Sequence, residues 1–185
     1  HAALPGWRAL AWERRVRIVR EAAEKIAERN LELAAWMVYE VGKTRLEAMA
    51  EVEESADLLR YYAERLESHR GYRRPLARMS PDEATESVLL PYGVWAVVSP
   101  FNFPSALAAG MIAGALLAGN TVVFKPALDA PVSGELLCEA LWAAGVPRDA
   151  LQLVHGPGSR VGETLLADQR IAGVAFTGSS EVGMR

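Results

Sequence analysis

The chain has 185 residues, of which 51% are hydrophobic, so it is long enough to bury the core of one large domain. Its formal net charge is −3, which argues against nucleic acid or an anionic membrane as a partner. The single cysteine, Cys138, excludes an intrachain disulfide and a cysteine-rich zinc module, and we expect no metal site. The first residues lack the charged start and apolar run of a signal peptide, so we expect a cytoplasmic protein.

The first third of the chain is predicted to be helical. Apolar residues recur at three- and four-residue spacing from Leu10 to Glu28, which predicts a first helix. A second helix is expected to begin with Asn30 as its N-cap and to end at Gly42. The segment Thr44–Glu47 matches a capping box, so a long third helix is expected to start there and to end before Gly71.

The pattern changes in the second third of the chain. Residues 71–87 show little periodicity, and we expect a loop that leads into a strand near Glu86–Leu90. After Gly93, short β-prone segments alternate with helical ones. The predicted strands are 94–98, 121–124, 151–154 and 173–176. The predicted helices are 104–118, 131–144 and 159–167, and Ser179 starts another. This alternation predicts an α/β fold, a Rossmann-like parallel sheet with flanking helices, preceded by the N-terminal helical segment.

Ligands bind at the carboxyl ends of the strands in such sheets, so the loops there are candidate sites. Asn102 lies between two phenylalanines and two prolines, and its rigid amide can donate to a developing oxyanion. The alternative is that Asn102 caps the next helix. Lys125 ends the second strand and can reach ribose hydroxyls or phosphate, or else it is a solvated lysine.

Two glycine-containing loops follow. Residues 156–162 have the spacing G-x-G-x-x-x-G, which suits close approach to a ligand but also an ordinary tight turn. Ser179 opens a helix whose N-terminus can accept a pyrophosphate, or it is a plain N-cap.

Together these motifs resemble the aldehyde dehydrogenase superfamily over nearly the whole chain. The matching segments are Pro100–Pro104, Gly119–Pro126, Gly145–Pro147, Gly156–Gly162 and Phe176–Gly183. The upstream pattern is similar to the 1-pyrroline-5-carboxylate dehydrogenase branch, which oxidises glutamate semialdehyde. Its matching residues are Val38–Lys43, Glu47, Glu51 and Tyr61–Ala63.

The resemblance implies an NAD- or NADP-dependent enzyme of proline catabolism that oxidises an aldehyde to a carboxylic acid. It implies that Asn102 is the catalytic oxyanion-hole amide. The cofactor contacts that it implies are Val98, Ser99, Pro100, Phe101, Lys125, Leu128, Gly158, Gly162, Phe176, Gly178, Ser179 and Val182. Leu128 replaces a glutamate that binds ribose hydroxyls in many NAD-specific members, so a 2′-phosphate is not repelled and the choice between NAD and NADP stays open.

The resemblance also divides the chain. Residues 1–71 are expected to be helices that pack on the cofactor domain, 72–92 part of an oligomerisation arm, and 93–185 a dinucleotide-binding domain that is incomplete at its C-terminal end. A homo-oligomer is implied. The family's nucleophilic cysteine and general-base glutamate lie beyond the last motif, so we expect a fragment that is inactive alone.

Other polar residues favour structural roles. Cys138 follows two leucines in a predicted helix, which is typical of a buried structural thiol. His155 is expected to be solvated, and so are Glu53 and Glu54. Two alternative functions stay open: a non-catalytic nucleotide-binding or dimerisation module, and a relative of acyl-phosphate reductases, which fits the motifs less well.

Overall fold

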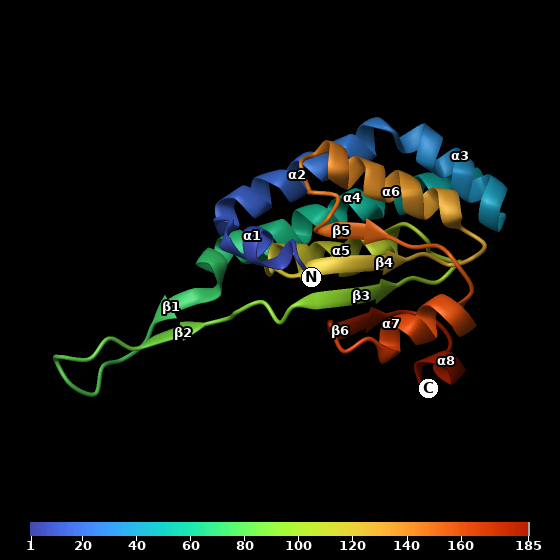
Figure 1. The fold of residues 1–185 in the computed structure, drawn as a ribbon. Helices are drawn as coiled ribbons and strands as arrows, with labels where there is room; N and C mark the ends of the chain where they lie inside the picture. Colours follow the sequence, from blue (N-terminus) through green and yellow to red (C-terminus); the bar gives the residue numbers. More distant parts are fainter. Residues whose placement is uncertain (185) are drawn as a thin grey trace.

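Helices form the first part of the computed structural model, which describes residues 1–184 (Figure 1). They are α1 (Leu4–Ala9), α2 (Trp12–Glu28), α3 (Asn30–Val41), α4 (Arg45–Ser68) and the 3₁₀ turn η1 (Arg70–Tyr72). The three predicted helices are confirmed as α2, α3 and α4, and α1 adds a short helix that the periodicity did not predict. Pro5 lies in the first turn of α1, where a missing N–H costs nothing.

The turn between α3 and α4 has the predicted end and start signals. Gly42 follows α3 in the left-handed conformation, with φ of 70°. Thr44 accepts a hydrogen bond from the Glu47 N–H, and the Glu47 carboxylate accepts one from the Thr44 N–H, which completes the capping box. The prediction for Asn30 is wrong: Arg29 holds the N-cap position, and the Asn30 amide donates instead to the Met49 carbonyl on α4, at 3.5 Å.

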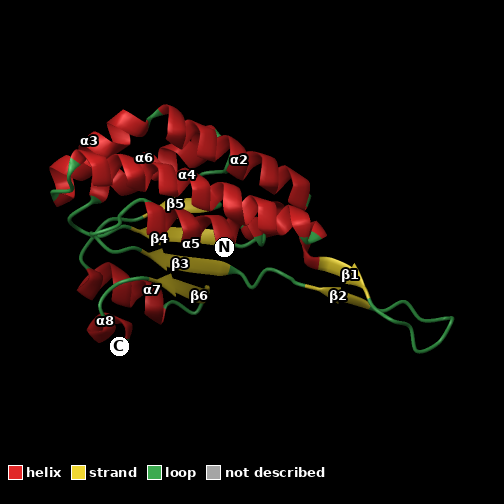
Figure 2. Cartoon of the chain, turned by 180° about the vertical axis from the view of Figure 1, so that it is seen from behind, coloured by secondary structure: helices red, strands yellow, loops and turns green. Residues whose placement is uncertain are grey.

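A four-stranded parallel sheet forms the second part of the molecule (Figure 2). Its strands are β3 (Val94–Val98), β4 (Thr121–Lys125), β5 (Leu151–Leu153) and β6 (Ile171–Phe176). The connecting elements are α5 (Ala106–Leu117), α6 (Pro131–Ala143), and the π-helical turn η2 (Gly158–Gly162) that continues into α7 (Glu163–Ala167); α8 (Ser180–Gly183) follows β6. The predicted α/β fold is therefore confirmed, and the predicted helix over 159–167 begins as a π-helical turn.

The order of the strands is β5-β4-β3-β6. The chain moves outward from β3 through β4 to β5 and then crosses back to place β6 on the other side of β3. Right-handed crossovers put α5 and α6 on one face and α7 on the opposite face. A crevice for a ligand is expected where the direction of winding reverses, at the carboxyl ends of β3 and β6.

A two-stranded hairpin projects from this body (Figure 1). Strand β1 (Arg73–Pro75) pairs antiparallel with β2 (Glu86–Val88), with Arg73 opposite Val88. The predicted strand near residue 86 is confirmed, but the expected loop is wrong at β1. The three residues of β1 are all exposed, so no burial pattern marked them, and Pro75 is tolerated because the strand has a free edge.

The first helices hold α5 at both of its ends. The Glu51 carboxylate on α4 accepts hydrogen bonds from the Ser105 and Ala106 N–H groups at the N-terminal end of α5. At the other end, Trp7 donates to the Leu116 carbonyl and Arg15 to the Leu117 carbonyl, each at 2.9 Å. A negative group at the N-terminus and a positive group at the C-terminus both favour the helix dipole.

Helix α6 is capped in the same way from α3. The two Glu40 carboxylate oxygens accept hydrogen bonds from the Val132 and Ser133 N–H groups, at 2.7 and 2.9 Å. These contacts join the N-terminal helices to the helices of the sheet, and one hydrophobic core runs through both, from Val19 and Leu59 to Phe124. Within residues 1–184, none of the helices has the length and apolar character needed to cross a membrane.

Candidate dinucleotide site at the carboxyl edge of the sheet

Three of the predicted cofactor contacts lie in a row at the carboxyl edge. Val98 ends β3, and it is paired in register with Lys125 on β4 and with Phe176 on β6. The first residue after β3 and the first residue after β6 are each hydrogen-bonded to the end of a neighbouring strand. The Ser99 N–H donates to the Lys125 carbonyl at 3.4 Å, and the Thr177 N–H donates to the Val98 carbonyl at 3.1 Å. The parallel register therefore brings three sequence-distant motifs together at the topological switch point.

Lys125 is buried rather than solvated, so the interpretation of a solvated lysine at the strand end is wrong. Its Nζ donates to the Pro126 carbonyl at 2.8 Å. An ammonium group has three N–H donors, so two remain for a ligand. Burial lowers the pKa of Lys125, because desolvation disfavours its charged form.

Ser99 is the second polar residue buried at this edge. Its hydroxyl has no hydrogen-bond partner among residues 1–184. A buried hydroxyl without a partner is unfavourable, so a ligand that pairs with it gains affinity. The neighbouring predicted contacts are more open: Pro100 is half-buried, and Phe101 and Leu128 are exposed.

The glycine-rich loop divides into a glycine that the fold needs and two that it does not. Gly156 has φ of 150°, and a Cβ there would lie 2.5 Å from the Val161 side chain. A Cβ on Gly158 or Gly162 would meet nothing within 4 Å. The two predicted cofactor glycines therefore leave open space over η2, and π-helical turns occur often at functional sites.

The last motif forms an open hollow between β6 and α8. The residues that line it are Phe176, Thr177, Gly178, Ser179, Ser180, Gly183 and Met184. A Cβ on Gly178 would lie 2.6 Å from the Phe176 ring, so glycine is required there by the packing of this turn. Ser179 is the N-cap of α8, with its Oγ accepting from the Val182 N–H at 3.3 Å, and it is exposed to the hollow. Val182 is exposed beside it.

Asn102 is exposed in the loop that follows β3. Its side chain forms no hydrogen bond within residues 1–184 and is free to donate to a substrate. The alternative that Asn102 caps α5 is wrong, because Glu51 takes that place through the Ser105 and Ala106 N–H groups.

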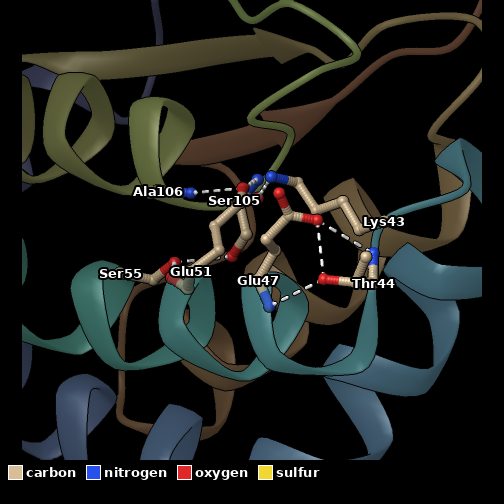
Figure 3. Close-up of polar contacts among 7 residues, drawn as sticks. All are labelled: Lys43, Thr44, Glu47, Glu51, Ser55, Ser105 and Ala106. Carbon is tan, nitrogen blue, oxygen red and sulfur yellow. Dashed lines mark hydrogen bonds and ion pairs between the residues drawn. The ribbon is translucent and has the colours of Figure 1, made fainter.

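Glu51 and Lys43 are the residues whose role the sequence did not reveal. In the sequence they contributed only to the resemblance to one branch of the family. In the structure, Lys43 Nζ and Glu51 Oε2 form an ion pair of 2.9 Å (Figure 3). A signal was present: Glu51 lies three residues after Ala48 and four before Ser55, on the inner face of the helix, where a glutamate needs a partner. The adjacent Glu53 and Glu54 are exposed as expected.

Cys138 is fully buried within α6. Burial, followed by the nearby charge of Glu135, raises the pKa of its thiol to about 12. A thiolate is the reactive form, so the structure supports the expected structural role rather than nucleophilic chemistry. His155 is exposed, and no group of three or more His, Cys, Asp or Glu suited to a metal ion occurs within the described chain.

The pKa of Cys138 predicts its labelling behaviour. At pH 8 only about one thiol in ten thousand is ionised, and it lies in the core, so we expect no reaction of the native chain with a disulfide reagent over minutes. The same chain unfolded in guanidinium chloride should release one equivalent of the thiol chromophore. Rapid release from the folded chain would contradict the buried role.

Comparison with known proteins agrees with this geometry. The model of the aldehyde dehydrogenase family matches residues 1–185. The chain is 38% identical to 1-pyrroline-5-carboxylate dehydrogenase 1 of Halalkalibacterium halodurans, over 97% of this chain and 34% of that protein. It is 39% identical to 2,5-dioxopentanoate dehydrogenase of Saccharolobus solfataricus, over 97% of this chain and 37% of that protein.

A solved structure shares the same fold. The crystal structure of 1-pyrroline-5-carboxylate dehydrogenase from Thermus with bound NAD superposes with a TM-score of 0.93 at 40% identity, covering 99% of this chain and 35% of that one. The chain thus spans about a third of the length of the relatives it matches. A family match over the whole chain, with the same architecture, shows that the chain belongs to the aldehyde dehydrogenase family.

Proposed function

We propose that this chain is the cofactor-binding part of an NAD- or NADP-dependent aldehyde dehydrogenase and is inactive alone. The observation that carries the proposal is two buried polar groups at the carboxyl edge of the sheet: the Lys125 ammonium, which uses one of its three donors, and the Ser99 hydroxyl, which has no partner within residues 1–184. Both groups favour a ligand rich in hydroxyl and phosphate oxygens.

The residues present fit a dinucleotide. Lys125 and Ser99 would bind ribose hydroxyls, and the open space over Gly158 and Gly162 would admit the adenosine side. Ser179 and the turn at Gly178 would face the pyrophosphate. The bound nicotinamide supplies the hydride acceptor. Leu128 is exposed and uncharged beside Lys125, so it would exclude neither NAD nor NADP.

The chain's own contribution to the chemistry is Asn102. Its amide N–H would donate to the oxygen of the aldehyde as negative charge develops there. The nucleophilic cysteine and the general-base glutamate that the resemblance implies would come from a longer polypeptide, because the only cysteine, Cys138, is buried with a raised pKa.

The relatives point to a substrate class. One relative is named 1-pyrroline-5-carboxylate dehydrogenase and the other 2,5-dioxopentanoate dehydrogenase. 2,5-Dioxopentanoate is a five-carbon acid with an aldehyde at its far end, and 1-pyrroline-5-carboxylate is the cyclic imine that glutamate semialdehyde forms by losing water. We assign glutamate semialdehyde as the substrate of the longer enzyme, in proline catabolism and in the cytoplasm, and the 2-oxo analogue is the competing substrate. Comparison of the two substrates at equal concentration with the longer enzyme decides between them, and preference for the 2-oxo compound would overturn the assignment.

Titration of the 185-residue chain with NAD⁺ and NADP⁺, followed by calorimetry, tests the cofactor site. We expect saturable binding that Lys125→Met weakens about tenfold or more, because a hydrogen bond from a charged donor is lost. Ser179→Ala should weaken it less, since the Ser179 backbone stays in place. The matched control is Lys25→Met, because Lys25 lies on α2 and pairs with Glu21.

Two outcomes count against the proposal. A folded chain that binds neither nucleotide contradicts it, and so does binding that Lys125→Met and Lys25→Met affect equally. The second candidate function is a dimerisation module, which the projecting β1–β2 hairpin favours (Figure 1). Sedimentation that shows a dimer in a chain without nucleotide affinity would select it.

A further inference from the structure

We propose that Lys43 and Glu51 are positioning residues for Asn102, holding the loop that carries its amide from the side opposite the sheet. The inference rests on the proposed function, because it concerns the amide that we assign to the oxyanion. It adds a second layer of residues, from the N-terminal helices, to a site otherwise built at the carboxyl edge of the sheet.

Glu51 fixes the far end of the loop. Its side chain is 0% exposed, and its Oε1 accepts from the Ser105 N–H at 2.8 Å and from the Ala106 N–H at 3.2 Å (Figure 3). The Ser105 hydroxyl adds a contact of 2.8 Å to the Ser55 hydroxyl, one turn along α4 from Glu51. The residues just after Asn102 are therefore attached to α4 rather than to the sheet.

Lys43 connects this anchor to the middle of the loop. Its Nζ lies 2.9 Å from Glu51 Oε2 and 4.0 Å from the centroid of the Phe103 ring. The contact with Oε2 is an ion pair without hydrogen-bond geometry, and no hydrogen-bond donor reaches this oxygen within the described chain. One ammonium group thus pairs with the buried carboxylate and binds the aromatic face next to Asn102.

The position of Asn102 depends on these neighbours. At the near end, the loop is tied by the Ser99 N–H to the Lys125 carbonyl. Between Ser99 and Ser105, the contact of Lys43 with Phe103 is the one side-chain polar or ring contact within residues 1–184, and Pro104 is buried. Asn102 forms no side-chain hydrogen bond of its own there, and the residue directly after it is the one that Lys43 contacts.

Lys43 is itself held by the turn between α3 and α4. Gly42 ends α3 in the left-handed conformation, and Thr44 begins α4 with a reciprocal capping box to Glu47. The lysine lies between these two fixed residues, and its side chain is only 12% exposed. An oxyanion donor contributes fully only when it is already in place. Contacts that hold the Asn102 loop on α4 therefore increase the stabilisation that its amide gives to the transition state.

The test uses the 185-residue chain labelled with ¹⁵N-asparagine, which contains only Asn30, Asn102 and Asn120. We expect the backbone order parameter of Asn102 to fall from about 0.85 to below about 0.6 in Lys43→Met, and to be restored in Lys43→Arg, which keeps the charge and the ring contact. Asn30 and Asn120 should keep their values, because their side chains donate to the Met49 and Ala115 carbonyls.

A second variant separates positioning from general stability. Phe103→Leu removes the aromatic ring that Lys43 contacts and leaves the ion pair of Lys43 with Glu51 in place. Phe103 is exposed, so little core packing is lost. We expect the order parameter of Asn102 to fall while hydrogen exchange of the Ser105 and Ala106 amides stays within about twofold of the wild type. This variant alone decides the matter if Lys43→Met does not fold.

Two results would overturn the inference. The first is an unchanged backbone order parameter of Asn102 in Phe103→Leu. The second is an equal fall of the order parameter at all three asparagines in a folded Lys43→Met chain. The affinity of the wild-type chain for NAD⁺ is measured in the same series. A wild-type chain that binds no nucleotide refutes the proposed function, whereas the order parameters refute or support the role of Lys43 and Glu51 separately.

Discussion

Replacing Glu51 by alanine is expected to lower the free energy of unfolding by about 4 kcal/mol, because it leaves the largely buried Lys43 ammonium without its partner. The two α5 N–H groups that Glu51 accepts from, on Ser105 and Ala106, lose their acceptor at the same time. The measurement is equilibrium unfolding in urea, with the slope compared between variants so that a change in the unfolded state is recognised.

Two neighbours on the same helix provide matched controls. Glu53 and Glu54 are exposed, so Glu53→Ala and Glu54→Ala should each change the free energy of unfolding by less than about 0.5 kcal/mol. The comparison holds residue type and helix constant and varies only burial and partners. A loss below 1 kcal/mol for Glu51→Ala, similar to the two controls, would show that α5 does not depend on this cap.

Replacing Leu59 by alanine is expected to cost about 3 kcal/mol, because the side chain is 0% exposed and its removal leaves a cavity. Leu59 belongs to the hydrophobic core that also contains Val97 and Phe124 of the sheet. We therefore expect one cooperative transition, lowered as a whole, by both circular dichroism and tryptophan fluorescence.

The matched control is Leu46→Ala, because Leu46 is on the same helix but is 80% exposed. It should change the free energy of unfolding by less than about 0.5 kcal/mol. Two separate transitions in the Leu59→Ala chain would mean that the N-terminal helices unfold independently of the sheet. That outcome would support the predicted division at residue 71 as a boundary between independent units.

Local patterns determined the order and type of most elements. The alternation of apolar runs and helical segments after Gly93 predicted the four parallel strands, because a buried strand and a crossover helix each need their own periodicity. The capping box at Thr44 and Glu47 was also visible, since both partners lie within one turn of helix. The sequence placed Val98, Lys125 and Phe176 at the ends of strands, whereas their position side by side came from the strand order in the structure.

Burial and pairing across long distances were decided only by the tertiary structure. Glu51 meets the Ser105 N–H across 54 residues, Glu40 the Ser133 N–H across 93, and Arg15 the Leu117 carbonyl across 102. No periodicity encodes which helix end a distant side chain reaches, so the caps of α5 and α6 were not predicted. The same reason explains Asn30, which was expected to cap its own helix and instead donates to α4.

The candidate site shows the same division. Its candidate residues were proposed from glycine, lysine and asparagine at the strand ends, where each residue also had an ordinary structural role available. The sequence did not show which of these residues has a structural role. In the structure Lys125 is buried, and Gly156 rather than Gly158 is required by the packing of its turn. Glu51, not Asn102, caps α5. The sequence by itself determined the family and the order of the elements, whereas the tertiary structure decided which loop groups are buried or paired, because burial and pairing depend on contacts that no local pattern encodes.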